Sequence, residues 1–66
     1  MNFEEIKECI NEWVWDNELG TYFWILSSNE ETKIMRVKGL SGHETQLLFR
    51  PGRYFKNAKK INNEIE

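Results

Sequence analysis

The stretch LLFRPGRYFKNAKK, residues 47–60, decides how the fold ends, because five basic and three aromatic residues surround one Pro-Gly pair. A tight two-residue hairpin needs a positive φ at its first central position, and the proline ring of Pro51 excludes that conformation. We therefore expect the chain to leave a sheet at Arg50. Beyond that corner, apolar residues recur at the spacing of one helix face, at Tyr54, Ala58, Ile61 and Ile65. The pattern predicts a basic C-terminal helix.

The N-terminal segment has the signature of a helix start. Asn2 precedes Glu5 by three residues, which is the spacing of an N-cap and its reciprocal acid. Apolar residues then follow at helical spacing, at Phe3, Ile6, Ile10, Trp13 and Val14. The sequence predicts a first helix from Phe3 to Asp16 that ends before Gly20.

Three segments between these helices are rich in branched and aromatic residues, and turn-like tetrapeptides separate them. They are TYFWILSS (21–28), ETKIMRVKG (31–39) and HETQLLFR (43–50). We expect a three-stranded antiparallel meander, and hence one α+β domain over residues 1–66 with the order helix, three strands, helix (αβββα). With KNAKK (56–60) early in the last helix, this order resembles the double-stranded RNA-binding domain in topology and length, a resemblance that assigns no binding residues.

Charge is divided along the chain, although the formal net charge is only −2. Residues 1–31 hold eight acids against one base, whereas residues 32–66 hold eight bases against three acids. Such asymmetry suggests an electrostatic partner for one half. The alternative is that the two halves neutralise each other inside one small fold.

The predicted first helix carries its acids opposite its apolar side. A large aromatic among acids is typical of an interface hot spot, which gives candidate protein-binding residues Glu4, Glu8, Glu12, Trp15 and Asp16. Alternatively, the helix ends after Trp13 and Trp15 turns back into the core.

The predicted sheet has a second face that no predicted core residue occupies. It would show Ile34, Arg36, Lys38, Gln46, Leu48 and Arg50, joined by either Tyr22, Trp24 and Leu26 or Phe23 and Ile25. Basic residues among exposed aromatics suit single-stranded nucleic acid, and a protein partner or a second copy of the chain would cover the same surface equally well. The alternative nucleic-acid site comprises Arg36, Lys38, Arg50, Arg53, Lys56, Lys59 and Lys60.

Catalytic and metal-binding motifs are missing from the sequence. There is one cysteine and one histidine, GHETQ (42–46) lacks a second histidine, and Cys9 lies on the apolar side of the predicted helix. No run of about 20 apolar residues occurs. We expect a cytoplasmic, non-enzymatic protein without cofactor, metal or membrane association.

These patterns favour a small binding protein. One alanine, seven asparagines and many Ile, Lys and Glu residues fit an AT-rich phage or mobile-element genome. We expect it to inhibit a host macromolecule, such as a nucleic-acid-handling defence enzyme in the manner of an anti-CRISPR protein, by protein–protein binding through the acidic helix face. The alternative is a nucleic-acid-binding regulator, and a homodimer is a further expectation because so small a core is marginally stable.

Overall fold

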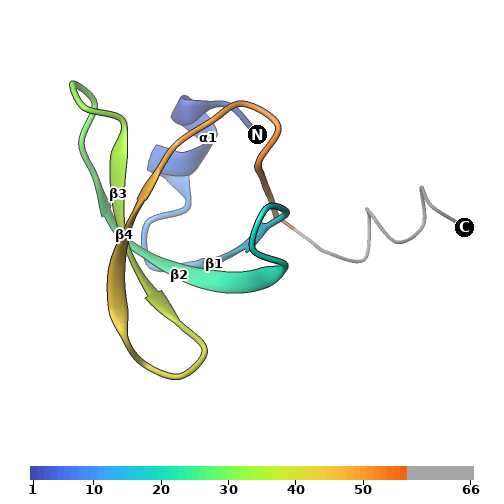
Figure 1. Ribbon diagram of the computed structural model, residues 1–66. Coiled ribbons are helices and arrows are strands. Elements are labelled where there is room, and N and C mark those ends of the chain that lie inside the picture. Colours follow the sequence, from blue (N-terminus) through green and yellow to red (C-terminus); the bar gives the residue numbers. More distant parts are fainter. Residues whose placement is uncertain (57–66) are drawn as a thin grey trace, which may run out of the picture.

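The protein is a strongly bent antiparallel sheet with one short helix, as described by a computed structural model for residues 1–56 (Figure 1). The elements are α1 (Phe3–Glu8), β1 (Trp13–Asp16), β2 (Thr21–Ser28), β3 (Ile34–Gly39), β4 (Glu44–Leu48) and β5 (Tyr54–Phe55). The strand order in the sheet is β4-β3-β2-β1-β5. The predicted αβββα order is therefore wrong, and so is the topological resemblance to the double-stranded RNA-binding domain.

The predicted first helix is shorter than expected. Its N-terminus is confirmed, because the Asn2 side chain accepts from the Glu5 amide and the Glu5 side chain accepts from the Asn2 amide, each at 2.9 Å. The helix ends at Glu8, and Asn11 then adopts a φ of 67°, which reverses the chain. Trp13 to Asp16 form β1 and pair with Thr21 to Trp24. A stretch of bulky aromatic residues gains more from cross-strand neighbours than from a continued helix.

The three predicted strands are present as β2, β3 and β4, but they belong to a five-stranded sheet and not to a three-stranded one. In β2, Phe23 and Ile25 point into the core while Tyr22 and Trp24 lie on the outer face, which decides between the two alternatives. The register between β2 and β3 shifts between Ile25 and Ser27. An irregularity of this kind bends a strand and increases its twist, so it contributes to the curvature of the sheet.

The predicted C-terminal helix does not begin at Tyr54, because Tyr54 and Phe55 form β5 and pair with Asp16 and Trp15. Gly52, at a φ of 80°, turns the chain between the two edges of the sheet. The Tyr54 hydroxyl then donates to the Leu48 carbonyl at 2.9 Å, which joins the β5 edge to the end of β4. The rest of the predicted helix, with Lys59 and Lys60, lies outside the described residues.

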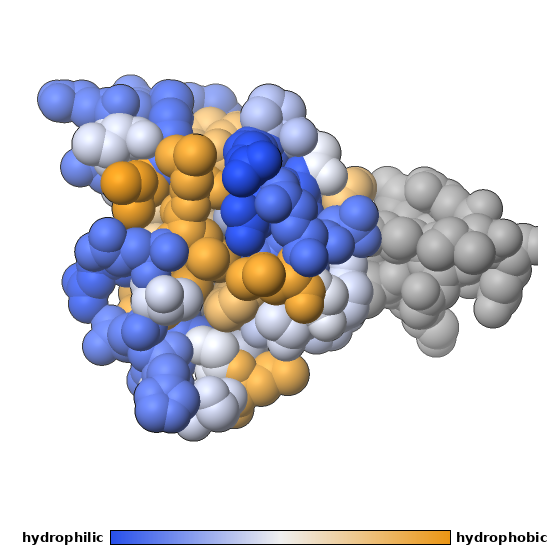
Figure 2. Space-filling view, viewed as in Figure 1, coloured by the Kyte–Doolittle hydropathy of each residue, from blue (hydrophilic) through white to orange (hydrophobic). Residues whose placement is uncertain are grey.

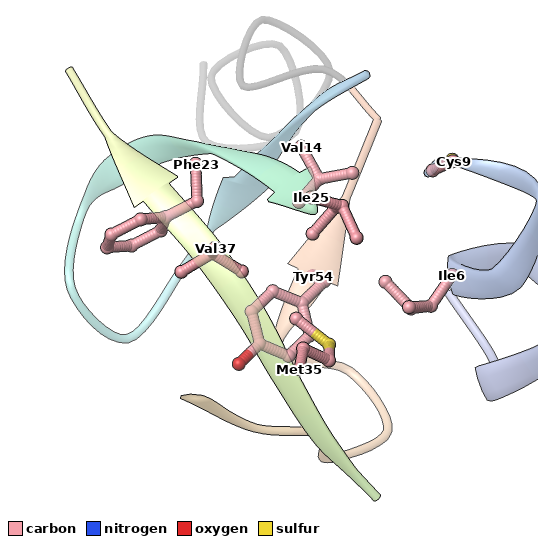
Figure 3. Close-up of a cluster of buried hydrophobic side chains, with 8 residues drawn as sticks. All are labelled: Ile6, Cys9, Val14, Phe23, Ile25, Met35, Val37 and Tyr54. Atoms are coloured by element: carbon pink, nitrogen blue, oxygen red, sulfur yellow. The ribbon is translucent and has the colours of Figure 1, made fainter. Parts of the chain in front are cut away.

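The concave side of the bent sheet holds the hydrophobic core (Figure 3). Its buried side chains come from β1, β2, β3 and β5 and from the α1 segment, and they are Ile6, Cys9, Val14, Phe23, Ile25, Met35, Val37 and Tyr54. Each large apolar side chain buried in this way stabilises the fold by about 1.5–3 kcal/mol. Since the inside is filled, binding surfaces must lie on the outside.

Candidate functional site

Four aromatic side chains gather on the outer side of the β1–β2 hairpin, and we call this surface the outer aromatic face. It consists of Trp13 and Trp15 from β1 and Tyr22 and Trp24 from β2. Strand alternation sends Val14 and Asp16 inward and the two tryptophans outward. The register places Trp13 opposite Trp24 and Trp15 opposite Tyr22.

The rings of the outer aromatic face meet edge to face. The centroids of Trp13 and Trp24 are 5.4 Å apart, and those of Trp15 and Tyr22 are 5.1 Å apart. Such pairs stabilise a hairpin by about 0.5–1.5 kcal/mol beyond the area they bury. Trp13 nevertheless remains 42% exposed. The rings are thus held in place by each other while part of their surface faces solvent.

A shallow apolar hollow of about 270 Å³ lies on this face, lined by Trp13, Tyr22 and Leu40. Leu40 directly follows β3 and is 69% exposed. A leucine this exposed beside two aromatic rings gives the hollow an apolar rim. The site therefore favours a small apolar group over a polar one.

Two of the three indole N–H groups have no acceptor among the described residues. The Trp15 indole lies 3.4 Å from the Asn17 side-chain oxygen, whereas those of Trp13 and Trp24 make no such bond. In residues 1–56, no buried side-chain nitrogen or oxygen lacks a hydrogen-bond partner. The indole nitrogen of the half-buried Trp24 is therefore not fully buried, and that of Trp13 belongs to a side chain that is 42% exposed.

The basic residues predicted for the outer sheet face are exposed, but most are already paired. Arg36 binds Glu44 at 2.7 Å and Arg50 approaches Glu18 at 3.7 Å. Lys38, opposite Trp24 in the register, makes no ion pair with a described residue. The described part of this face thus has little excess positive charge.

The apolar part of that prediction is confirmed. Ile34 and Leu48 face each other across β3 and β4 and are 37% and 48% exposed. On the side viewed in Figure 2, apolar residues reach the surface between hydrophilic ones.

The predicted acidic helix face does not form one surface. Glu4 and Glu8 lie on α1, Glu12 lies in the turn after it, and Trp15 lies on β1. Asp16 is fully buried. The cause is the early end of the helix, which separates residues that a longer helix would have aligned. A binding role for the exposed Glu4 and Glu8 stays a prediction.

Asp16 and Arg53, predicted for opposite kinds of site, bind each other. The Arg53 Nε lies 2.9 Å from Asp16 Oδ1 and its Nη2 lies 2.8 Å from Oδ2. The hydrogen bonding that Arg53 donates to the Asp16 carboxylate raises the pKa of Arg53. Glu18 also pairs with Arg50 and Arg53 at 3.7 Å. The acidic and basic halves thus neutralise each other where they meet, and Arg53 is not free to bind a phosphate.

A larger hollow of about 410 Å³ lies at the far end of β2. It is lined by Ser27, Ser28, Asn29, Thr32, Ile34, Arg36 and Gln46. Its arginine is held by Glu44, and the Asn29 side chain accepts from the Glu31 and Thr32 amides at 2.9 and 3.1 Å. Its strongest polar groups therefore already serve the fold.

In residues 1–56, no cluster of His, Cys, Asp and Glu could hold a metal ion. Cys9 is buried as predicted, and burial is the main reason that the pKa of its thiol is raised. In the same residues, no helix has the length and apolar character needed to cross a membrane.

Comparison with known proteins identifies no relative, since no protein family, curated protein or solved structure matches the chain. The outer aromatic face must therefore be judged by its own chemistry. Trp13 is the member that helical spacing assigned to the core. The signal that could have found it is WVWD (13–16), where two tryptophans flank a valine at the period of a strand.

Proposed function

We propose that this protein is a small non-enzymatic binding protein that engages another protein through its outer aromatic face. The observation that carries this proposal is the gathering of three tryptophans and a tyrosine on the solvent side of a sheet whose core is filled by other residues. Tryptophan and tyrosine are enriched where binding energy concentrates in protein interfaces. The edge-to-face pairs stabilise the hairpin, and the 42% of Trp13 that stays exposed is the part left for a partner.

Charge favours a protein over nucleic acid as the partner. Nucleic-acid sites depend on unneutralised Lys and Arg, because phosphate contacts supply most of the affinity. The chain has a net charge of −2, Arg36 and Arg50 are paired with glutamates, and Arg53 is buried. Of the predicted basic residues that the structure describes, Lys38 and Lys56 are exposed without an ion pair to a described residue, and two such lysines are a weak basis for holding a phosphate backbone.

The expected inhibition of a host defence enzyme stays a prediction that rests on composition. Its proposed mechanism through an acidic helix loses support, because the helix ends at Glu8 and Asp16 is buried. If the protein is an inhibitor, we expect the outer aromatic face to make the decisive contact.

Site-specific photo-crosslinking tests the proposal. A benzophenone amino acid replaces Leu40, beside the hollow, or Glu8, on α1, and lysate of the source cells is irradiated with each variant. We expect an adduct from position 40 that protease digests, that nuclease leaves intact and that Trp13→Ala abolishes. A nuclease-sensitive adduct, or one formed from position 8 alone, would overturn the proposal.

A further inference from the structure

The outer aromatic face also indicates which kind of protein segment it binds, an inference that rests on the proposed function. We infer that it takes an extended proline-containing segment in the polyproline II conformation. A prolyl ring occupies the hollow between Trp13, Tyr22 and Leu40, and the indole N–H groups of Trp13 and Trp24 donate to backbone carbonyls of the segment.

The position of the face in the sheet leaves little free backbone for strand addition. A peptide that adds to a sheet needs the free N–H and C=O groups of an edge strand. Strands β1 and β2 are both internal, since β1 lies between β5 and β2, and β2 lies between β1 and β3. The backbone of β2 is engaged on both sides, and that of β1 pairs with β5 only at Trp15 and Asp16, so this face contacts a ligand mainly through its side chains.

Hydrogen-bonding complementarity favours polyproline II over a helix. A polyproline II segment makes no internal hydrogen bonds, so its carbonyls seek outside donors, and proline itself brings no N–H. The described face offers two unpartnered indole donors, at Trp13 and Trp24. A helical ligand already satisfies its own carbonyls and would leave these donors unused.

Shape leads to the same class of ligand. Edge-to-face packing sets neighbouring rings at 76° and 69°, which leaves an apolar recess and not a flat plate. Aromatic-lined recesses on small β domains suit the compact aliphatic ring of proline, whose preformed conformation keeps the entropy cost of binding low.

Charge at the border adds a second requirement. Lys38 lies between Trp24 and Glu44 in the register and makes no ion pair with a described residue, so it can attract an acidic residue next to the proline. A second copy of this chain fits less well. Its one proline, Pro51, follows Arg50, which would approach Lys38 with like charge.

Peptide selection followed by titration tests the inference. A phage-displayed library of random 12-residue peptides is selected on the intact protein and counter-selected on Trp13→Ala. We expect the selected peptides to be enriched in proline with an adjacent acid. In fluorescence titrations, Trp13→Ala should weaken binding at least about tenfold and Lys38→Glu should weaken it less. Leu48→Ala, an exposed leucine on β4, should leave binding within about twofold.

A fold check and a conservative variant keep the result interpretable. Thermal unfolding shows whether Trp13→Ala folds. Trp13→Phe retains an aromatic ring but removes the indole donor, so its affinity should lie between that of the intact protein and that of Trp13→Ala. Peptides that depend on Trp13 but lack proline would overturn the inference and leave the proposed function standing. Proline-rich peptides that are selected without the counter-selection and bind Trp13→Ala unchanged would also overturn it.

Two further outcomes overturn the inference. In the first, the selection yields no peptide whose binding depends on Trp13, and a peptide of ten prolines at millimolar concentration leaves the tryptophan fluorescence of the protein unchanged. The other is a dimer in sedimentation that Trp13→Ala dissociates, because a second copy would then occupy the face. In both cases the crosslinking experiment still decides the proposed function by itself.

Discussion

Arg53 donates hydrogen bonds to both carboxylate oxygens of Asp16, from Nε to Oδ1 at 2.9 Å and from Nη2 to Oδ2 at 2.8 Å. Both side chains are buried. The same Asp16 oxygen Oδ1 accepts from the Glu18 amide at 2.9 Å, and the Arg53 carbonyl accepts from the Asn17 amide at 2.8 Å. The pair thus joins the start of β5 to the turn after β1. It is one of the contacts that hold the chain after Pro51 beside β1, where Tyr54 and Phe55 pair with Asp16 and Trp15.

Removing one partner of this pair should strongly destabilise the protein. Arg53→Ala leaves the Asp16 carboxylate buried without its counter-ion, which costs about 3–5 kcal/mol in comparable cases. Chemical denaturation measures the change. The matched control is Arg36→Ala, whose exposed pair with Glu44 should contribute only about 0–1 kcal/mol. Equal losses in the two variants would contradict a structural role for the buried pair.

Tyr54 should make stability fall at alkaline pH. Burial raises the pKa of its hydroxyl from the ordinary 10.0 to about 12. Because the folded pKa lies above the unfolded one, this contribution is complete below pH 10 and is lost as the pH rises to about 12. The loss amounts to roughly 2–3 kcal/mol, measured by denaturation at a series of pH values.

The control for that pH dependence is Tyr54→Phe. It removes the hydrogen bond to the Leu48 carbonyl, so it should be less stable at pH 7 by about 1 kcal/mol. Its stability should nevertheless fall less between pH 10 and 12. If the variant and the parent protein lose stability in parallel over that range, another group is responsible.

The fold should require glycine at position 20 because of its backbone conformation, and not because a larger side chain would clash. Gly20 has a φ of 67°, and an added Cβ would meet nothing within 4 Å. Gly20→Ala should therefore cost about 1–2 kcal/mol through the left-handed conformation alone. Gly39→Ala is the comparison, because that residue lies outside the positive-φ region and its Cβ would sit 3.7 Å from Phe23, an ordinary contact. A larger loss for Gly39→Ala would refute this explanation.

Cys9 should report global or local opening of the α1 segment. Its side chain is only 2% exposed and the pKa of its thiol is raised by burial, so little reactive thiolate is accessible in the folded state. We expect a thiol reagent at pH 8 to react much more slowly with folded protein than with protein in denaturant. Rapid labelling of the folded protein, at the rate of the unfolded chain, would show that α1 does not cover the core in solution.

Sequence alone determined the features whose signals are local. The capping pair Asn2 and Glu5, the strands β2, β3 and β4, and the exposure of Ile34 and Leu48 all follow from spacing of a few residues. The two-residue period of a strand also left only two possible outward sets for residues 21–28, one with Tyr22 and Trp24 and the other with Phe23 and Ile25. These elements could be predicted because neighbours in the chain supply most of the information.

Tertiary structure decided the fate of WVWD (13–16) and of Tyr54–Phe55, and with it the outer aromatic face. Both segments carry apolar residues that fit a helix or a strand, and both are too short to be stable alone. They become strands because β1 pairs with β2 on one side and with β5 on the other. In addition, Arg53 forms hydrogen bonds with Asp16, 37 residues earlier in the chain. Contacts between residues far apart in the sequence stabilise a segment only after the chain has folded back, so no local sequence pattern predicts them.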